Sequence, residues 1–368
     1  MTRKLVTVRK IDDIQSIEGA DLIVKATVDG WNIVVKKDEF SVGDYCVMFE
    51  IDSFLPIDDD RYEFLKKSSY KKMNGQEGLR LKTVKLRGVV SQGLVLPVDR
   101  FPEIQEYAEE NGGLEVIEEE RHDLSELLGV VKYEIPDVGK GCKPAGNFPW
   151  YVSKTDEERL ENLYKDFSVR YKDVAFTPTL KLDGSSTTLV CVNNENYFFD
   201  SEETDNNGFQ AIVCSRNLAL KYDPESMFWK GWENDDLVNN IKQWTLDTGI
   251  QVAVQGELMG PGVQGNKEQL HRFRVYAFRV YNIDEQRFMN LDEMKTFCND
   301  VGMYTTVIYD SFKPFSEFES LDEIMRYADG PSINSKNREG LVYVSEDENG
   351  ERISFKTISR KFLLKSEE

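Results

Sequence analysis

The sequence predicts an α+β protein in which a small N-terminal β-barrel precedes a larger domain of antiparallel sheets with helices. Short apolar runs separated by turn residues fill residues 3–98, which is typical of a small all-β module. Beyond Phe176, strand-like runs recur with helical intervals between them, which favours an α+β domain. At 368 residues, 40% of them hydrophobic, the chain can bury a core in each domain.

The N-terminal module is expected over residues 1–134. Asp29-Gly30 between two apolar runs predicts a hairpin. Several short strands in so few residues favour a closed barrel, and an OB-like barrel is preferred because such barrels commonly bind nucleic acid. The strand-like runs are 5–8, 22–28, 31–35, 45–51, 79–86 and 89–98.

Charge is distributed unevenly along this module. The net charge of −20 does not suggest a phosphate-binding partner, yet residues 66–87 carry eight basic residues and one acid. Residues 103–126 carry ten acids and one arginine. We interpret the acidic block as a solvated insertion, whereas the basic block is either a solvated face or a phosphate-contacting one.

A second domain is expected over residues 147–368. The segment 135–150 is rich in proline and glycine and predicts a linker. Residues 155–163 begin with a Thr or Asp cap and acidic residues, which predicts a short helix. Further helical intervals lie near 235–247, 291–301 and 319–328.

Several classes of protein are disfavoured by composition. The five cysteines show no Cys-x-x-Cys pair, so we expect reduced thiols, neither disulfides nor a zinc site. With only two histidines, Ser-His-Asp, Cys-His and multi-histidine metal sites are nearly excluded. No signal peptide or membrane-spanning apolar stretch is evident, so we expect a soluble, intracellular protein with no membrane partner. The expected compartment is the cytoplasm, with the nucleus or a viral origin as alternatives, and the expected form is a monomer.

The most informative segment is Thr179-Leu180-Lys181-Leu182-Asp183-Gly184. On a strand, residues two apart share a face, so Lys181 and Asp183 are expected side by side. A free lysine has a pKa of about 10.4 and attacks phosphorus only when burial or a nearby cation favours its neutral form. A carboxylate that organises a metal beside Lys181 would meet this need. The alternative is a strand-edge lysine paired with an aspartate before a turn.

Four further segments follow in a fixed order: Ser215-Arg216-Asn217, Gln255-Gly256-Glu257, Arg338-Glu339-Gly340 and Ser354-Phe355-Lys356. Each alone is compatible with an ordinary strand-end, turn or surface residue. Asp183, Glu257 and Glu339 are carboxylates that could hold Mg²⁺ through its waters. Such a cation would neutralise charge in an in-line displacement at phosphorus.

This ordered set resembles the covalent nucleotidyltransferases, which include ATP-dependent DNA and RNA ligases and mRNA capping enzymes. The whole chain resembles the Naegleria-type RNA ligases, in which an OB domain precedes an ATP-grasp-like nucleotidyltransferase domain. Gly30-Trp31 and residues 50–56 are similar to the N-terminal signature of that family. Residues 154–159 are similar to a feature in which the arginine, here Arg159, contacts phosphate.

The resemblance implies ATP and Mg²⁺ or Mn²⁺ as cofactors, and Lys181 as the residue that becomes adenylated. It places Glu257 and Glu339 on metal waters or the ribose, and Arg216 on the ribose or the nucleic-acid end. Lys356 would stabilise the α-phosphate in the transition state.

The resemblance also implies that Leu180 and Phe278 bind the nucleotide, with the ring of Phe278 stacked on adenine; the alternative for Phe278 is a core residue. Two positions depart from the family pattern. Ser354 stands where many ligases have a lysine, which leaves two alternatives: Lys356 suffices alone, or another lysine, such as Lys361 or Lys365, helps. Arg279 stands where an acidic residue is common.

Twelve residues follow Lys356, too few for the C-terminal OB domain of capping enzymes and most DNA ligases, which favours an RNA ligase. The expected partner is RNA or a nicked RNA-containing duplex, joined through lysyl-AMP and an adenylylated 5′-end. We expect residues 66–87 to orient the pyrophosphate leaving group. The alternatives are a DNA ligase, a capping-type nucleotidyltransferase, or a noncatalytic OB-based nucleic-acid-binding protein.

Overall fold

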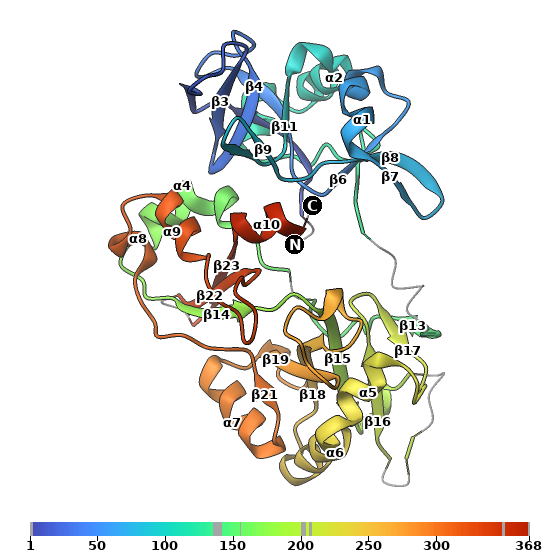
Figure 1. Ribbon diagram of the computed structural model, residues 1–368. Helices are drawn as coiled ribbons and strands as arrows, with labels where there is room; N and C mark the ends of the chain where they lie inside the picture. The colour runs from blue at the N-terminus through green and yellow to red at the C-terminus, as the bar shows by residue number, and fades with distance from the viewer. Residues whose placement is uncertain are drawn as a thin grey trace.

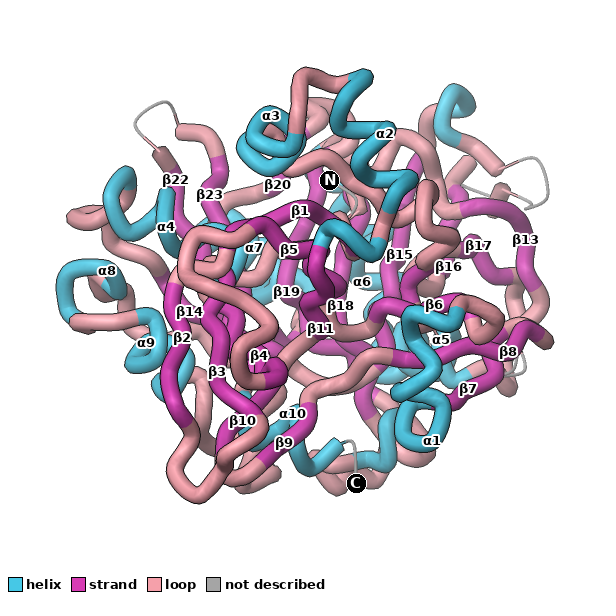
Figure 2. The backbone as a smooth tube through the Cα atoms, turned by 90° about the horizontal axis from the view of Figure 1, so that it is seen from above, coloured by secondary structure: helices cyan, strands magenta, loops and turns pink. Residues whose placement is uncertain are grey.

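A computed structural model describes residues 3–134, 142–154, 156–199, 204–205, 208–347 and 350–366. The N-terminal domain lies above two sheets of a second domain, each with its own helices (Figure 1). From above, the β2-β3-β4 sheet and the β7-β8 hairpin lie on opposite sides of the N-terminal domain (Figure 2). The predicted α+β class is confirmed. No helix in the described segments is both long and apolar enough to cross a membrane.

Short antiparallel strands form the N-terminal domain, as predicted. The hairpin at Asp29-Gly30 is confirmed, with Asp29 at φ 52° between β3 and β4. Its sheets are β1-β5-β11, β2-β3-β4, β12-β6-β8-β7 and β10-β9. The strands are β1 (Val6–Lys10), β2 (Asp13–Ser16), β3 (Ile23–Val28), β4 (Trp31–Lys36), β5 (Tyr45–Phe49), β6 (Ser53–Pro56), β7 (Tyr70–Met73), β8 (Gln76–Arg80), β9 (Val84–Leu86), β10 (Val89–Ser91), β11 (Leu94–Pro97) and β12 (Val131–Lys132).

Short helices lie between these strands: η1 (Asp60–Leu65), α1 (Lys66–Ser69), η2 (Val98–Arg100), α2 (Pro102–Glu110) and α3 (Leu114–Glu119). The acids of the block 103–126 are mostly exposed, as predicted, but the helices that carry them also pack on the domain. Ile104, Ala108 and Ile117 are buried in the core of the domain, and the acids take the outer side of an amphipathic pair of helices.

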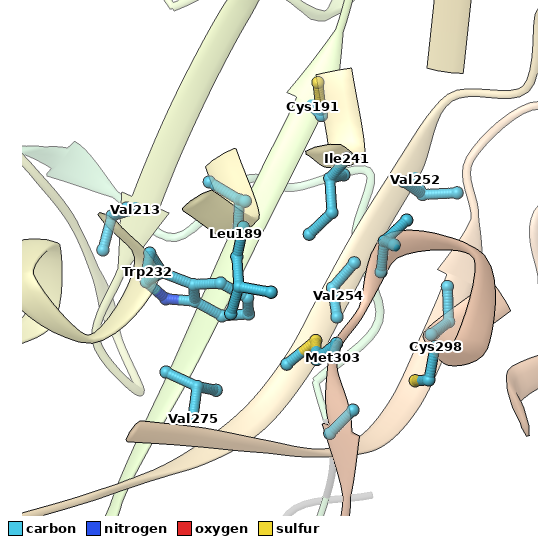
Figure 3. Packing of buried hydrophobic residues seen from close by; sticks show 14 of the residues in the cluster. Leu189, Cys191, Val213, Trp232, Ile241, Val252, Val254, Val275, Cys298 and Met303 are labelled. Carbon is cyan, nitrogen blue, oxygen red and sulfur yellow. The ribbon is translucent and has the colours of Figure 1, made fainter. Parts of the chain in front are cut away.

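The larger sheet of the second domain has the order β13-β17-β16-β15-β18-β19-β20, with β21 beside β19. It packs on α5, α6 and α7, with Trp232 among the buried hydrophobic residues between them (Figure 3). Trp232 Nε1 donates to Thr187 Oγ1 at 2.9 Å. The elements are β13 (Pro144–Asn147), β15 (Ser185–Val192), η3 (Glu195–Tyr197), β16 (Gln210–Cys214), β17 (Leu218–Leu220), α5 (Met227–Glu233), η4 (Asn234–Asp236), α6 (Leu237–Thr248), β18 (Val252–Met259), η5 (Gln264–Asn266), β19 (Arg274–Asn282), β20 (Arg287–Phe288), α7 (Leu291–Val301) and β21 (Tyr304–Thr305). The five cysteines remain thiols, as predicted.

The smaller sheet has the order β14-β22-β23 and carries the remaining helices. Its aromatic core includes Phe176, Tyr343 and Phe355, with the last two rings stacked at 4.5 Å. The elements are α4 (Leu160–Arg170), β14 (Thr177–Lys181), α8 (Pro314–Glu317), α9 (Leu321–Tyr327), β22 (Gly340–Glu346), β23 (Arg352–Ile358) and α10 (Arg360–Ser366).

Two local predictions need correction. The helix expected over 155–163 begins at Leu160, because Arg159 is extended and bridges to Lys356 of β23; Thr155 lies outside the described residues. The end of the expected linker is strand β13, which pairs with β17. Residues 135–141 of that linker lie outside the described residues.

Hydrogen bonds join the two domains directly. Trp31 Nε1 donates to Asn162 Oδ1 at 2.7 Å, and Asn162 Nδ2 donates to Glu50 Oε1 at 2.7 Å. The backbone N of Gly30 donates to Glu161 O at 3.0 Å, so close that a Cβ on Gly30 would lie 2.7 Å from the Cα of Glu161. The family-like Gly30-Trp31 pair is thus a docking point for α4.

Candidate active site

A cavity of about 320 Å³ lies where the two sheets of the second domain meet the N-terminal domain. We call it the catalytic cavity. Eight of the residues singled out in the sequence line it: Arg159, Leu180, Lys181, Arg216, Glu257, Phe278, Glu339 and Lys356. They come from segments far apart in the chain, and the fold brings these separate sequence motifs together in one cavity.

Lys181 is the last residue of β14 and faces Glu339. The pairing of β14 with β22 sets Lys181 opposite Gly340, and Lys181 Nζ donates to Glu339 Oε2 at 2.6 Å. Burial lowers the pKa of Lys181, but the charges of Glu339 and Glu257 outweigh it, so the pKa is raised. The amine is therefore held in its charged form in the free protein.

Glu257 reaches the same place from β18. Its Oε1 accepts from the backbone N of Gly184 at 2.9 Å. A Cβ on Gly184 would lie 2.4 Å from Leu258 O, so only glycine allows this approach. Burial raises the pKa of Glu257 to about 8, although Lys181 pulls it down.

The carboxylates of Glu257 and Glu339 and the ammonium of Lys181 therefore lie close together in the cavity. Burial also raises the pKa of Glu339, and the charge of Asp183 adds to this rise although Lys181 opposes it. Among the described residues, no group of three His, Cys, Asp or Glu side chains could hold a metal by itself. One or two carboxylates, completed by waters and substrate phosphates, are what Mg²⁺ usually takes, so Glu257 and Glu339 fit such a cation.

Asp183 does not share a strand face with Lys181, contrary to the sequence prediction. Strand β14 ends at Lys181, and Asp183 lies in the following turn, where its Oδ2 accepts from Lys267 Nζ at 2.5 Å. Asp183 is not among the described residues that line the catalytic cavity. Its charge still contributes to the raised pKa of Lys181.

Several cations line the same cavity. Lys356 Nζ donates to Asp156 Oδ1 at 2.9 Å, and Arg216 lies 3.5 Å from Asp156 Oδ2. Burial lowers the pKa of Lys356 to about 8 despite the attraction of Asp156. Arg159 is buried beside Lys356 through the strand-like bridge. These cations suit phosphate oxygens.

Phe278 enters the cavity because β19 carries a bulge. Gln255 pairs with Arg279 and the next residue, Gly256, pairs with Ala277, so Phe278 is the extra residue. A bulge re-aims a side chain that would otherwise continue the alternation of the strand. A Cβ on Gly256 would lie 2.5 Å from Val275, so the glycine permits this pairing.

Comparison with known proteins identifies the family. A profile described as an RNA ligase matches residues 175–358, and one described as an OB-fold domain matches residues 5–98. Naegleria gruberi RNA ligase solved with PPi is 35% identical, with 98% of each chain covered and a TM-score of 0.82. The chain belongs to the RNA ligase family. The resemblance seen in the sequence is confirmed.

Two other structures of the Naegleria gruberi ligase match similarly. A mutant with AMP and Mn is 34% identical, with 98% of each chain covered and a TM-score of 0.82. A mutant with ATP and Mn is 35% identical, with 98% of each chain covered and a TM-score of 0.81. No curated protein matches the chain.

The two departures from the ligase pattern meet at one residue of this RNA ligase. Glu157 accepts from Ser354 Oγ and Arg279, and lies 3.1 Å from Arg352. Glu157, Arg279 and Arg352 all line the catalytic cavity. Guanidinium groups therefore supply positive charge near the position that Ser354 leaves without a lysine.

Lys361 and Lys365 do not take over this role in the ligase. Lys361 lies 3.1 Å from Asp329, and Lys365 is exposed near the end of α10. Neither is among the described residues that line the catalytic cavity.

Sequence reasoning assigned the contribution of the N-terminal domain to residues 66–87 and missed Arg3 and Lys132. Arg3, Asp52 and Lys132 line the catalytic cavity of the ligase, whereas none of the basic residues of 66–87 is among its described lining residues. Arg3 is held by Glu50 at 2.7 Å and lies 3.7 Å from Asp52. Only Asp52, within the family-like segment 50–56, gave a signal in the sequence. Within 66–87, Lys72 pairs with Glu77 at 2.8 Å and Arg80 with Asp52 at 2.8 Å.

Proposed function

We propose that this RNA ligase uses ATP to join a 3′-hydroxyl end to a 5′-phosphate end, with AMP carried on Lys181. The observation that supports it most is the position of Lys181, which ends β14 in a cavity lined by both carboxylates and cations.

In the first step, Nζ of Lys181 attacks the α-phosphorus of ATP. A nitrogen–phosphorus bond forms, the bond to the bridging oxygen breaks, and pyrophosphate leaves. The amine must first lose the proton that Glu339 now holds in place. A divalent cation, Mg²⁺ or Mn²⁺, held by Glu257 and Glu339 through waters, would offset their charge and lower the pKa of Lys181. The negative charge of Asp183 also raises the pKa of Lys181.

The remaining cavity residues bind the nucleotide. Lys356 stabilises the charge that develops on the α-phosphate, while Arg159 and Arg216 contact phosphate or ribose. The ring of Phe278 stacks on adenine, and Leu180 forms the floor beside the nucleophile. We assign the orientation of the leaving group to Arg3 and Lys132 of the N-terminal domain, not to residues 66–87.

The second and third steps use the same residues. The 5′-phosphate of RNA attacks the lysyl-AMP, which frees Lys181 and leaves AMP on the RNA end through a pyrophosphate linkage. The 3′-hydroxyl then attacks that 5′-phosphate and expels AMP. We propose a nick in an RNA-containing duplex as the substrate and a monomer as the working form.

Intact mass after incubation with ATP and a divalent metal tests this function. The protein is first treated with pyrophosphate, because ligases can purify already adenylated. An AMP-sized adduct on the wild type, absent from Lys181→Ala, is expected, followed by sealing of a nicked RNA duplex. An adduct with GTP in place of ATP would favour a capping-type enzyme. No adduct with either nucleotide would favour a noncatalytic binding protein, and sealing of DNA ends alone would favour a DNA ligase.

A further inference from the structure

A second cavity of about 550 Å³ lies along the seam between the N-terminal domain and the larger sheet. We call it the seam cavity. It shares Arg3, Lys132, Asp156, Ser186 and Arg216 with the catalytic cavity, so the two spaces adjoin. A chain that leaves the catalytic cavity by this route would pass through the seam cavity.

The floor of the seam cavity is polar. Ser186 and Thr188 are two apart on β15 and share a face, and Gln255 of β18 is the cross-strand partner of Thr188. These side chains offer hydroxyl and amide groups where the other side of the same sheet offers the aliphatic core around Trp232.

Gln255 has an oxygen without a partner. The residue is 3% exposed, and its Nε2 donates to Ser153 O at 2.8 Å, which fixes the orientation of the amide. Its Oε1 is buried and accepts no hydrogen bond from the described residues. An unsatisfied buried acceptor is unfavourable, so this position favours a ligand that brings a donor.

Four cations line the same space: Arg3, Lys132, Lys154 and Arg216. Three acids also line it: Glu134 and Asp156 are paired with Lys132 and Lys356, whereas Asp123 accepts a hydrogen bond from Ser125 and keeps its charge. Lys154 contacts Asn217 Oδ1 at 3.1 Å and the ring of Phe148 at 5.5 Å, and forms no ion pair within the described segments. Positive charge there remains available to an anion.

We propose that the seam cavity binds the ribose-phosphate backbone of the RNA strand being joined, and that Oε1 of Gln255 accepts a hydrogen bond from a ribose 2′-hydroxyl. A ligand with both phosphate charge and a hydroxyl donor matches the two features of the cavity, and the 2′-hydroxyl distinguishes RNA from DNA. The proposal rests on the proposed ligase function. Gln255 thereby becomes a specificity-determining residue outside the catalytic cavity.

The test is the single-turnover sealing of a pre-adenylylated nicked duplex. Substrates carry one 2′-deoxynucleotide at each of the first few positions on either side of the nick, or on the complementary strand. For the wild type we expect the rate to fall about tenfold at one position in a joined strand, which is the loss of one hydrogen bond to a buried group. In Gln255→Met the all-RNA and the 2′-deoxy substrates should seal at the same rate.

Gln251→Met is the matched control, since Gln251 is buried just before β18 and bonds Asp284 away from both cavities. It should keep the wild-type discrimination. Lysine adenylation by ATP tests the ligase function by itself, independently of the seam cavity. The absence of an AMP adduct on the wild type would contradict the ligase function. An adduct with discrimination that survives in Gln255→Met, or that lies only in the complementary strand, contradicts the seam site.

Lys154→Ala provides a second test that does not depend on a buried substitution, because Lys154 is exposed. The salt dependence of binding to the nicked RNA duplex should lose about one unit of slope, which corresponds to one phosphate contact. An unchanged slope would show that the RNA backbone does not pass Lys154.

Discussion

The catalytic cavity holds two lysines in opposite electrostatic settings. Lys181 faces Glu339 and Glu257, and its pKa is raised above the ordinary value. Lys356 is buried with one acid, Asp156, and its pKa is lowered to about 8. The lysine proposed as the nucleophile is thus stored in its unreactive charged form, whereas the lysine proposed to bind phosphate loses its proton easily.

If Lys181 is the nucleophile that we propose, this contrast would prevent premature chemistry. Lys181 would become nucleophilic only when something offsets the carboxylates, and the cation that accompanies ATP is suited to do so. Lys356 gains a second anionic neighbour when phosphate arrives, which stabilises its charged form. Both lysines would reach their working protonation state only with substrate bound.

Replacing the nucleophile should have the largest effect. Lys181→Ala should lower the rate of AMP-adduct formation by at least about 10⁴-fold, since no other group can form the bond. Intact mass measures the adduct. Lys361→Ala is the control, because Lys361 pairs with Asp329 outside the cavity and should keep the wild-type rate. An adduct of normal yield on Lys181→Ala would place the nucleophile elsewhere.

Glu339→Gln tests the raised pKa of Lys181. Loss of the carboxylate should lower this pKa, so the pH at which adenylation reaches half its plateau should move to a lower value. The plateau itself should fall about 10³-fold, because the cation loses a site. Quenched single-turnover adenylation against pH measures both, with the exposed Glu346→Gln as control. A midpoint that moves upward would contradict the charge assignment.

Lys356 should produce the opposite limb of the pH profile. Its pKa of about 8 predicts that kcat/KM for ATP declines as pH rises above about 8, because the free enzyme loses the positive charge there. Lys356→Arg should remove the decline, since a guanidinium stays charged. Lys356→Gln should lower the rate about 10²-fold at all pH values. A decline that persists in Lys356→Arg would assign it to another group.

The two lysines also show what the sequence could and could not predict. Alternation along a strand placed Lys181 and Lys356 on pleated surfaces, and both strands are confirmed as β14 and β23. The same rule failed for Asp183, because it assumes that the strand continues. Strand β14 ends at Lys181, before Asp183 is reached. The chain then turns where Gly184 lies close to Leu258 O, and no local sequence pattern predicts that contact.

Contacts between distant segments were the least predictable. Arg3 and Lys132 reach the catalytic cavity only after the two domains dock, and that docking depends on Trp31, Asn162 and Glu50. The helix start at Leu160 was misplaced for the same reason, since the preceding acids are used by partners in β19 and β23. Helix propensity depends on the local segment alone, whereas the start of this helix is determined by contacts with distant residues.

The contact between the two domains should affect the binding of ATP. Asn162→Ala removes bonds to Trp31 and Glu50 and should lower the free energy of unfolding by about 1–3 kcal/mol. KM for ATP should rise about tenfold with kcat less affected, because Arg3 loses its fixed position. Asn239→Ala, on the far side of α6, is the control. An unchanged KM would show that the N-terminal domain does not help to bind ATP.

The smallest effect is expected where this chain departs from other ligases. Ser354→Lys restores the missing lysine, but Arg279 and Arg352 already face Glu157 beside that position. We therefore expect the adenylation rate to change less than about threefold, because a third cation adds little to a pair of guanidinium groups. Arg352→Gln should lower the rate more than Ser354→Lys changes it. If instead Ser354→Lys accelerates adenylation more than tenfold, the two guanidinium groups do not replace the lysine in stabilising phosphate.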